Sequence, residues 1–196
     1  ICAPENTLEA FQYAISLGVQ GIELDVHICA DGIPVVIHDA NVARTSNGTG
    51  LVKNLTLAEL KDLDFSKGHP RYKGARIPTL EEALELIKPS GILINLELKT
   101  TTVFYPGIEE KVLKLARKME LHQRMLYSSF NHYTLQRIVK LDSRARIGIL
   151  YGNALTNPEY YAEYLGAYAI HPPYTQVLRS PALVENCHRR GIRVPA

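Results

Sequence analysis

Tryptophan is absent from the 196-residue chain, and only three cysteines occur, Cys2, Cys29 and Cys187. An odd number of distant cysteines without a C-x-x-C spacing argues against a disulfide framework and against a zinc site. A reducing compartment fits this cysteine content, so we expect a cytoplasmic protein. A signal peptide upstream of Ile1 stays open as the alternative.

A strong excess of charge of either sign and a long apolar run are also missing. Lys and Arg number 22 against 20 Asp and Glu, which gives a formal net charge of +2. This balance does not favour nucleic acid or a membrane surface as a partner, so we expect a small molecule. No apolar run reaches the roughly 18 residues of a membrane span, and the first residues, ICAPENTLEAF, do not resemble a signal peptide. We therefore expect no stable membrane insertion, whereas the oligomeric state is open.

The residues that are present predict a single domain over residues 1–196, because 46% are hydrophobic and 21% are charged. Short apolar segments bounded by Gly, Pro or Asp predict buried strands at residues 20–26, 33–38, 91–98, 124–128, 145–150, 166–170 and 191–195. Amphipathic patterns predict helices at residues 4–18, 78–88, 107–121, 131–141, 157–165 and 180–191. Asn131 and Ser180 are the predicted N-caps of two of these helices.

Strands that alternate with helices at this spacing predict an α/β fold with a parallel sheet, most economically closed as a TIM (β/α)8-type barrel. A complete barrel needs eight strands and about 250 residues. This sequence opens with a predicted helix and stops soon after its seventh predicted strand. We therefore expect a barrel that lacks strand 1 and the end of strand 8 in the sequence given.

Two connections are irregular. Only residues 27–32 separate the first two predicted strands, too few for a helical crossover. A plain hairpin would place Asp25 and His38 near opposite ends of the sheet, so we expect an extended return that leaves the two strands parallel. Residues 39–77 are polar with at most one short helix near 56–63, and we expect them to form a small lid-like excursion over one end of the barrel.

Three carboxylates lie near the ends of two predicted strands. Glu23 and Asp25 are two residues apart, so their side chains leave the same face of the strand. Glu97 lies in a second buried strand, in NLELK, two residues before Lys99. Carboxylates this close are costly to bury unless a cation lies between them, and oxygen ligands suit Mg²⁺ or Ca²⁺. The alternative is that they end the strands and pair with Lys or Arg.

His38, Phe130 and His171 also lie at the ends of predicted strands. Histidine titrates near neutrality, which suits His38 to proton transfer beside the carboxylates, while Lys99 would stabilise negative charge on a phosphoryl group. Phe130 and His171 are candidates for substrate contact, although packing is the commoner role of such residues. The other histidines show no ligand spacing: His27, His69, His122, His132 and His188.

Five segments, in this order, resemble the glycerophosphodiester phosphodiesterase family: APENTLEAF, GIELDVHICADGIPVVIHD, RTSNGTG, IPTLEEAL and LINLELK. The resemblance covers nearly the whole chain and continues through SSFN. It implies a TIM barrel of lipid and glycerol metabolism. With one divalent cation, such a barrel would hydrolyse glycerophosphocholine, glycerophosphoethanolamine or similar diesters to an alcohol and glycerol 3-phosphate.

Carried over residue by residue, the resemblance implies metal ligands at Glu23, Asp25 and Glu97. It also implies a catalytic histidine at His38 and a phosphate-facing lysine at Lys99. These are the residues that the strand pattern alone brings together, so the two lines of reasoning agree.

The PENT segment matches a family motif next to the site, which makes Glu5 and Asn6 candidates for contacts with the substrate or with the metal ligands. Starting the first helix is the equally weighted alternative. The family's second catalytic histidine lies in an H-R-G motif that precedes PENT, so it is expected upstream of Ile1. The tryptophan usual in the family's final strand is also missing.

Two other functions fit the same residues. A lysophospholipase D-type phosphodiesterase would need an apolar surface for an acyl chain, and the polar, lysine-rich 39–77 segment disfavours it. A catalytically inactive barrel that binds glycerophosphodiesters is disfavoured because all five site residues are present together.

Overall fold

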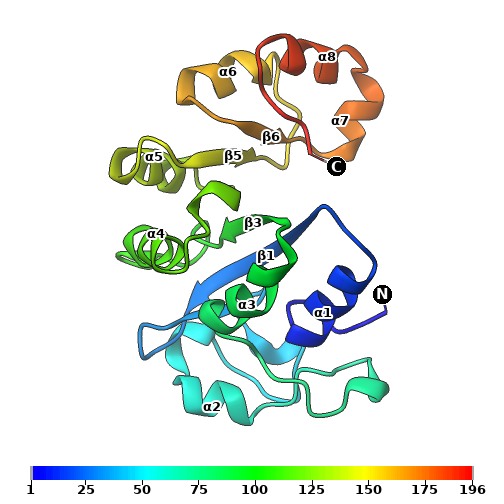
Figure 1. Cartoon of the computed structure of the whole chain (residues 1–196), viewed down its shortest axis with the longest axis vertical. Helices are drawn as coiled ribbons and strands as arrows, with labels where there is room; N and C mark the ends of the chain where they lie inside the picture. Colours follow the sequence, from blue (N-terminus) through cyan, green and yellow to red (C-terminus); the bar gives the residue numbers. More distant parts are fainter. Residues whose placement is uncertain (1, 196) are drawn as a thin grey trace.

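The computed structural model describes residues 2–195 and contains one six-stranded sheet in the order β2-β1-β3-β4-β5-β6 (Figure 1). The strands are β1 (Gly21–Ile28), β2 (Pro34–Val36), β3 (Leu93–Leu98), β4 (Met125–Ser129), β5 (Arg146–Leu150) and β6 (Ala169–His171). All neighbours from β1 to β6 are parallel except β2, which is antiparallel to β1. The seventh predicted strand forms a single parallel bridge, between Arg193 and Ala169. Within residues 2–195 the sheet is open, with β2 at one edge and β6 at the other.

Helices separate the parallel strands, as the amphipathic patterns predict. They are α1 (Leu8–Ser16), α2 (Leu57–Asp62), α3 (Leu80–Ile87), α4 (Ile108–Lys118), α5 (His132–Leu141), α6 (Pro158–Leu165), α7 (Tyr174–Arg179) and α8 (Ala182–Arg189). Short 3-10 helices are η1 (Val42–Arg44), η2 (Val52–Asn54), η3 (Pro70–Tyr72), η4 (Lys88–Ser90) and η5 (His122–Arg124). In the part of the chain that the structure describes, no helix has the length and apolar character needed to cross a membrane.

The predicted N-caps are half right. The Asn131 side chain accepts a hydrogen bond from the backbone N–H of Tyr133 and caps α5. Ser180 instead ends α7, a helix that the sequence analysis missed, and Pro181 precedes α8. The prediction for Ser180 was wrong because a second short helix ends immediately before the predicted one begins.

Strands β1 and β2 form an antiparallel hairpin, so the predicted parallel return is wrong. Val26 pairs with Val36, and Ile28 pairs with Pro34. β1 runs on beyond Asp25 before it turns, and the chain comes back over the same length, so the Ile37 N–H donates to the Asp25 carbonyl at 3.0 Å. The hairpin therefore places Ile37 opposite Asp25 and His38 one residue further along, so the antiparallel pair itself brings His38 close to Asp25.

Alternation along the strands separates an apolar face from a polar one. Leu24, Leu96 and Tyr127 are buried in the main apolar core. The same core includes residues of the covering helices: Leu84 of α3, Val112 of α4 and Leu135 of α5. Because successive side chains point to opposite faces of a strand, the carboxylates of β1 and β3 lie on the face turned away from these helices.

Residues 39–77 form the excursion between β2 and α3, which contains η1, η2, α2 and η3. Its buried apolar side chains form a second cluster with residues of the hairpin: Cys29, Val35, Ile37, Val42, Val52, Leu60, Phe65 and Ile77. Figure 1 shows α2 at one end of the molecule and α6, α7 and α8 at the other. The second cluster fixes the excursion to β2, and so places its first residues directly after His38. That the excursion acts as a lid stays a prediction, and so does the single domain over residues 1–196.

Candidate active site

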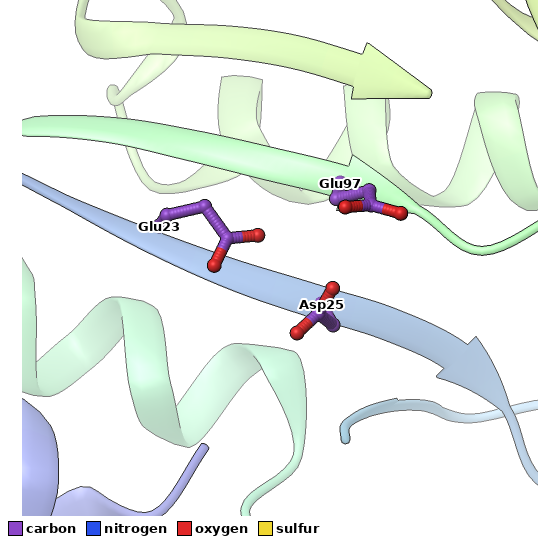
Figure 2. Close-up of side chains that lie close together, drawn as sticks. All are labelled: Glu23, Asp25 and Glu97. Carbon is purple, nitrogen blue, oxygen red and sulfur yellow. The ribbon is translucent and has the colours of Figure 1, made fainter. Parts of the chain in front are cut away.

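Three carboxylates from adjacent strands point into the same space, Glu23 and Asp25 from β1 and Glu97 from β3 (Figure 2). Asp25 is the register partner of Glu97. One oxygen of each carboxylate lies within 4.8 Å of the others. Asp25 is 3% exposed and Glu97 9% exposed, whereas the Glu23 residue is partly exposed although its carboxyl group lies against the other two. Three oxygen ligands converging on one point suit a hard divalent cation that keeps some of its own water.

The pKa values of these carboxylates also indicate a cation site. Loss of hydration raises the pKa of the Glu23 carboxyl group to about 8, and the charges of Asp25 and Glu97 add to the effect. Burial likewise raises the pKa of Glu97, although Lys99 opposes it. Raised carboxyl pKa values mean that the negative charge here is under-compensated, and a bound cation would reverse both shifts.

Lys99 lies beside the two buried carboxylates. Its Nζ is 2.8 Å from Glu97 Oε1 and 3.3 Å from Asp25 Oδ1. Burial disfavours the charged form of Lys99, but the hydrogen bond with Glu97 and the charge of Asp25 outweigh it and raise its pKa. Apart from this 3.3 Å ion pair with Lys99, the buried Asp25 Oδ1 has no hydrogen-bond partner within residues 2–195. A buried carboxylate oxygen without a hydrogen bond is a ready ligand for a cation, so the residues present fit one.

Asn6 holds Asp25 in place from the segment before α1. Its Nδ2 donates to Asp25 Oδ2 at 2.8 Å, and its Oδ1 accepts from the Asp25 backbone N–H at 3.3 Å. Asn6 adopts a left-handed backbone with φ +55°, which is uncommon for a residue other than glycine. Thr7, rather than Glu5 or Asn6, caps α1. The contact that the sequence left open for Asn6 is therefore made with a metal-ligand candidate.

His38 begins a chain of polar contacts that the sequence analysis did not foresee. His38 Nδ1 lies 2.7 Å from Asp39 Oδ1, and Arg44 Nε donates to Asp39 Oδ2 at 2.6 Å. Arg44 also donates to both carboxylate oxygens of Glu5, at 2.8 and 2.6 Å. The Arg44 hydrogen bonds lower the pKa of Asp39 to about 2 and also lower the pKa of Glu5. The available signals were the pair His38-Asp39 and the arginine of RTSNGTG.

His27, which showed no ligand spacing, supports the backbone of His38. His27 Nε2 lies 3.1 Å from the His38 carbonyl oxygen, and Nδ1 lies 2.8 Å from the Tyr105 hydroxyl. Burial lowers the pKa of His27, which favours the neutral ring. A neutral ring that donates from Nε2 accepts the Tyr105 hydroxyl at Nδ1, so both contacts are satisfied together.

Phe130 and His171 differ in their relation to the carboxylates. The register runs from Glu97 through Ser128 and Gly148 to Ala169, two residues before His171, so His171 lies on the same face of the sheet as the carboxylates. Phe130 is 45% exposed and lines a groove of about 530 Å³ together with His132, Tyr133 and Tyr161. His171 packs over Gly148, where an added Cβ would lie 2.6 Å from its Nε2. Within residues 2–195 no hydrogen bond joins either residue to the carboxylates, so substrate contact by Phe130 or His171 stays a prediction.

Known proteins resemble this chain over most of its length. Residues 2–196 match the sequence model of the Glycerophosphoryl diester phosphodiesterase family. A glycerophosphodiester phosphodiesterase of Caldanaerobacter subterraneus subsp. tengcongensis is 45% identical over 192 residues, which are 97% of this chain and 78% of that protein. One of Bacillus altitudinis is 42% identical over 171 residues, covering 86% and 70%.

Solved structures give the fold. The glycerophosphodiester phosphodiesterase of Agrobacterium tumefaciens is 32% identical with a TM-score of 0.84, covering 98% of this chain and 80% of that one. An Oleispira antarctica phosphodiesterase in complex with the product sn-glycerol-3-phosphate is 30% identical with a TM-score of 0.77, covering 98% and 87%. The matched family and structures have the TIM-barrel fold, so the fold class predicted from the sequence is confirmed.

Proposed function

Because the chain belongs to the glycerophosphoryl diester phosphodiesterase family, we propose that it hydrolyses glycerophosphodiesters to an alcohol and sn-glycerol 3-phosphate with one divalent cation. The observation that carries the proposal is the convergence of Glu23, Asp25 and Glu97, because one carboxylate oxygen of each lies within 4.8 Å of the others. A relative of the chain was solved with sn-glycerol-3-phosphate bound, which agrees with this product.

Glu23, Asp25 and Glu97 are the residues that would hold the cation. When bound, the cation would supply a Lewis acid for a phosphoryl oxygen. An all-oxygen ligand set favours Mg²⁺ or Ca²⁺ over zinc or iron. Lys99, whose Nζ already faces Asp25 and Glu97, would offset the negative charge that develops on the phosphoryl group.

His38 is the proposed proton-transfer residue. Its Nδ1 is engaged by Asp39, which leaves Nε2 as the ring nitrogen that exchanges a proton with substrate or water. The family resemblance implies a second histidine in an H-R-G motif upstream of Ile1, and the two would divide the acid and base roles. Attack by water and attack by the glycerol 2-hydroxyl through a cyclic phosphate are both compatible with this arrangement.

The proposed substrate is a small, water-soluble head-group diester such as glycerophosphocholine or glycerophosphoethanolamine, and no nucleic acid partner is proposed. A cytoplasmic location is proposed on cysteine content alone: Cys2 is exposed as a free thiol, and Cys29 and Cys187 are buried and unpaired. Exposed free thiols are commoner in a reducing compartment.

The test is release of sn-glycerol 3-phosphate by the full-length protein, with and without a chelator, from a panel that includes glycerophosphocholine and lysophosphatidylcholine. We expect cation-dependent turnover of glycerophosphocholine, and in the variant His38→Ala most turnover should be lost while the cation still binds. Faster turnover of lysophosphatidylcholine would favour the lysophospholipase D alternative. Binding of the diesters without turnover would favour the inactive barrel.

A further inference from the structure

Arg44 links two carboxylates that are far apart in the sequence to the side chain of His38. We propose that Arg44 is a positioning residue for hydrolysis: by clamping Glu5 and Asp39 together, it fixes the orientation of His38 and the ring nitrogen that His38 presents. The inference rests on the proposed role of His38 as the proton-transfer residue.

The geometry of the guanidinium group carries the argument. Arg44 Nε and Nη2 donate to the two oxygens of Asp39 at 2.6 and 3.1 Å, and Nη1 and Nη2 donate to the two oxygens of Glu5 at 2.8 and 2.6 Å. Two adjacent edges of the planar fork are thus both bidentate, which a lysine cannot reproduce. Glu5 lies 39 residues before Arg44, so the clamp joins the segment before α1 to the start of the excursion.

A gain in stability does not account for this arrangement. The side chains of Arg44, Glu5 and Asp39 are 48%, 35% and 32% exposed, and ion pairs at such exposure contribute little to folding. What the clamp does provide is a fixed place for the Asp39 carboxylate, whose Oδ1 lies 2.7 Å from His38 Nδ1. The neighbouring contact, between His27 and the His38 carbonyl, fixes the backbone of the same residue.

The charges also suit a histidine that takes up a proton. One guanidinium between two carboxylates leaves a net charge of −1, which a protonated His38 would balance. The Arg44 hydrogen bonds hold the pKa of Asp39 at about 2, so this carboxylate stays ionised whenever His38 gains a proton. An ionised partner at Nδ1 selects the tautomer that carries its hydrogen there, so Nε2 is free for the reaction.

Kinetics of Arg44 variants test the inference. In Arg44→Ala we expect kcat for glycerophosphocholine to fall about 100-fold because the catalytic group is misplaced, while KM and Mn²⁺ affinity stay unchanged. Arg44→Lys should recover only part of the loss. Millimolar guanidinium chloride should restore turnover to Arg44→Ala, because the free ion can occupy the space between the two carboxylates. The matched control is Arg76→Ala, because Arg76 lies in the same excursion and donates to the Leu63 carbonyl. It should show wild-type kinetics and no response to guanidinium.

Nitrogen-15 NMR of the His38 ring in the metal-free protein gives a readout that needs no activity. The wild type and Arg76→Ala should show the hydrogen on Nδ1, whereas Arg44→Ala should show a mixture of tautomers. Wild-type kcat in a folded Arg44→Ala protein, or an unchanged His38 spectrum, would overturn the inference. A wild-type protein that releases no sn-glycerol 3-phosphate would instead overturn the proposed function, and the tautomer measurement would still test the clamp.

Discussion

Asn6 offers the sharpest single perturbation of the candidate site, because it contacts Asp25 without being a ligand candidate itself. Asn6→Gly removes the donor at 2.8 Å from Asp25 Oδ2 and the acceptor at 3.3 Å from the Asp25 backbone N–H. Glycine tolerates the backbone at φ +55° better than any other residue, so the change adds no strain. The substitution therefore isolates the loss of the two hydrogen bonds.

The expected magnitude follows from the charge of Asp25. A hydrogen bond to a charged group contributes about 1.5–3 kcal/mol, and each 1.4 kcal/mol is about tenfold in a dissociation constant. Loss of the contact that orients a ligand carboxylate should therefore weaken cation binding by about 10- to 100-fold, a range also typical of residues that support metal ligands.

Calorimetric titration with Mn²⁺ measures this change, and thermal denaturation checks the fold. Asn157→Gly is the matched control, because Asn157 also has a left-handed backbone, with φ +51°, and makes no side-chain capping bond. Both variants should fold, with Asn6→Gly melting lower because it loses two hydrogen bonds to a buried carboxylate, and only Asn6→Gly should lose affinity. Equal Mn²⁺ affinity in Asn6→Gly and the wild type would refute the role assigned to Asn6.

The remaining predictions concern Glu23, Lys99 and Gly148. Because the pKa of Glu23 is raised to about 8, its proton competes with the cation below that pH. The affinity for Mn²⁺ should therefore rise by up to about tenfold per pH unit toward pH 8 and then level off. Solvent screening of this partly exposed residue should make the slope smaller. For the same reason the metal-free protein should lose stability as pH rises from about 5 to 8, since its folded state retains a proton that the unfolded chain has released. A melting temperature that increases over this range would contradict the raised pKa of Glu23. Lys99→Met should strengthen Mn²⁺ binding in calorimetric titration, because it removes a positive charge from Asp25 and Glu97, yet should lower kcat about 100-fold or more; wild-type turnover would count against its role. Gly148→Ala should cost about 1–3 kcal/mol of folding free energy in urea denaturation, because its Cβ would lie 2.6 Å from His171 Nε2. If Gly148→Ala costs the same in a protein that already carries His171→Ala, this clash is not the cause.

Local sequence patterns predicted those helices and strands whose residue pattern is set by burial against a single core. The period of apolar residues located β3, β4, β5 and the helices between them, because burial against one core imposes that period. The sequence did not reveal that β1 and β2 are antiparallel. The direction of a short return depends on pairing between strands, and a span of six residues is compatible with either direction.

Some residues of the candidate site could be predicted from local sequence patterns, whereas others are placed by contacts between distant segments. Glu23, Asp25 and Glu97 were foreseeable because costly polar residues interrupt apolar strands at matching positions. Arg44 was not, because its role depends on a long-range contact with Glu5, and nothing in RTSNGTG by itself shows which surface the arginine faces. Asn6 was foreseen only as a neighbour of the site, since its backbone conformation and its contact with Asp25 arise from packing.

The central claim is that Glu23, Asp25 and Glu97 hold the cation on which hydrolysis depends. Equilibrium dialysis of Mn²⁺ against the full-length wild type and the isosteric variant Asp25→Asn, with each sample's melting curve taken alongside, tests it most directly. We predict one bound Mn²⁺ per chain in the wild type and none at the same free concentration in a folded Asp25→Asn protein. One Mn²⁺ per chain in both proteins would contradict the claim.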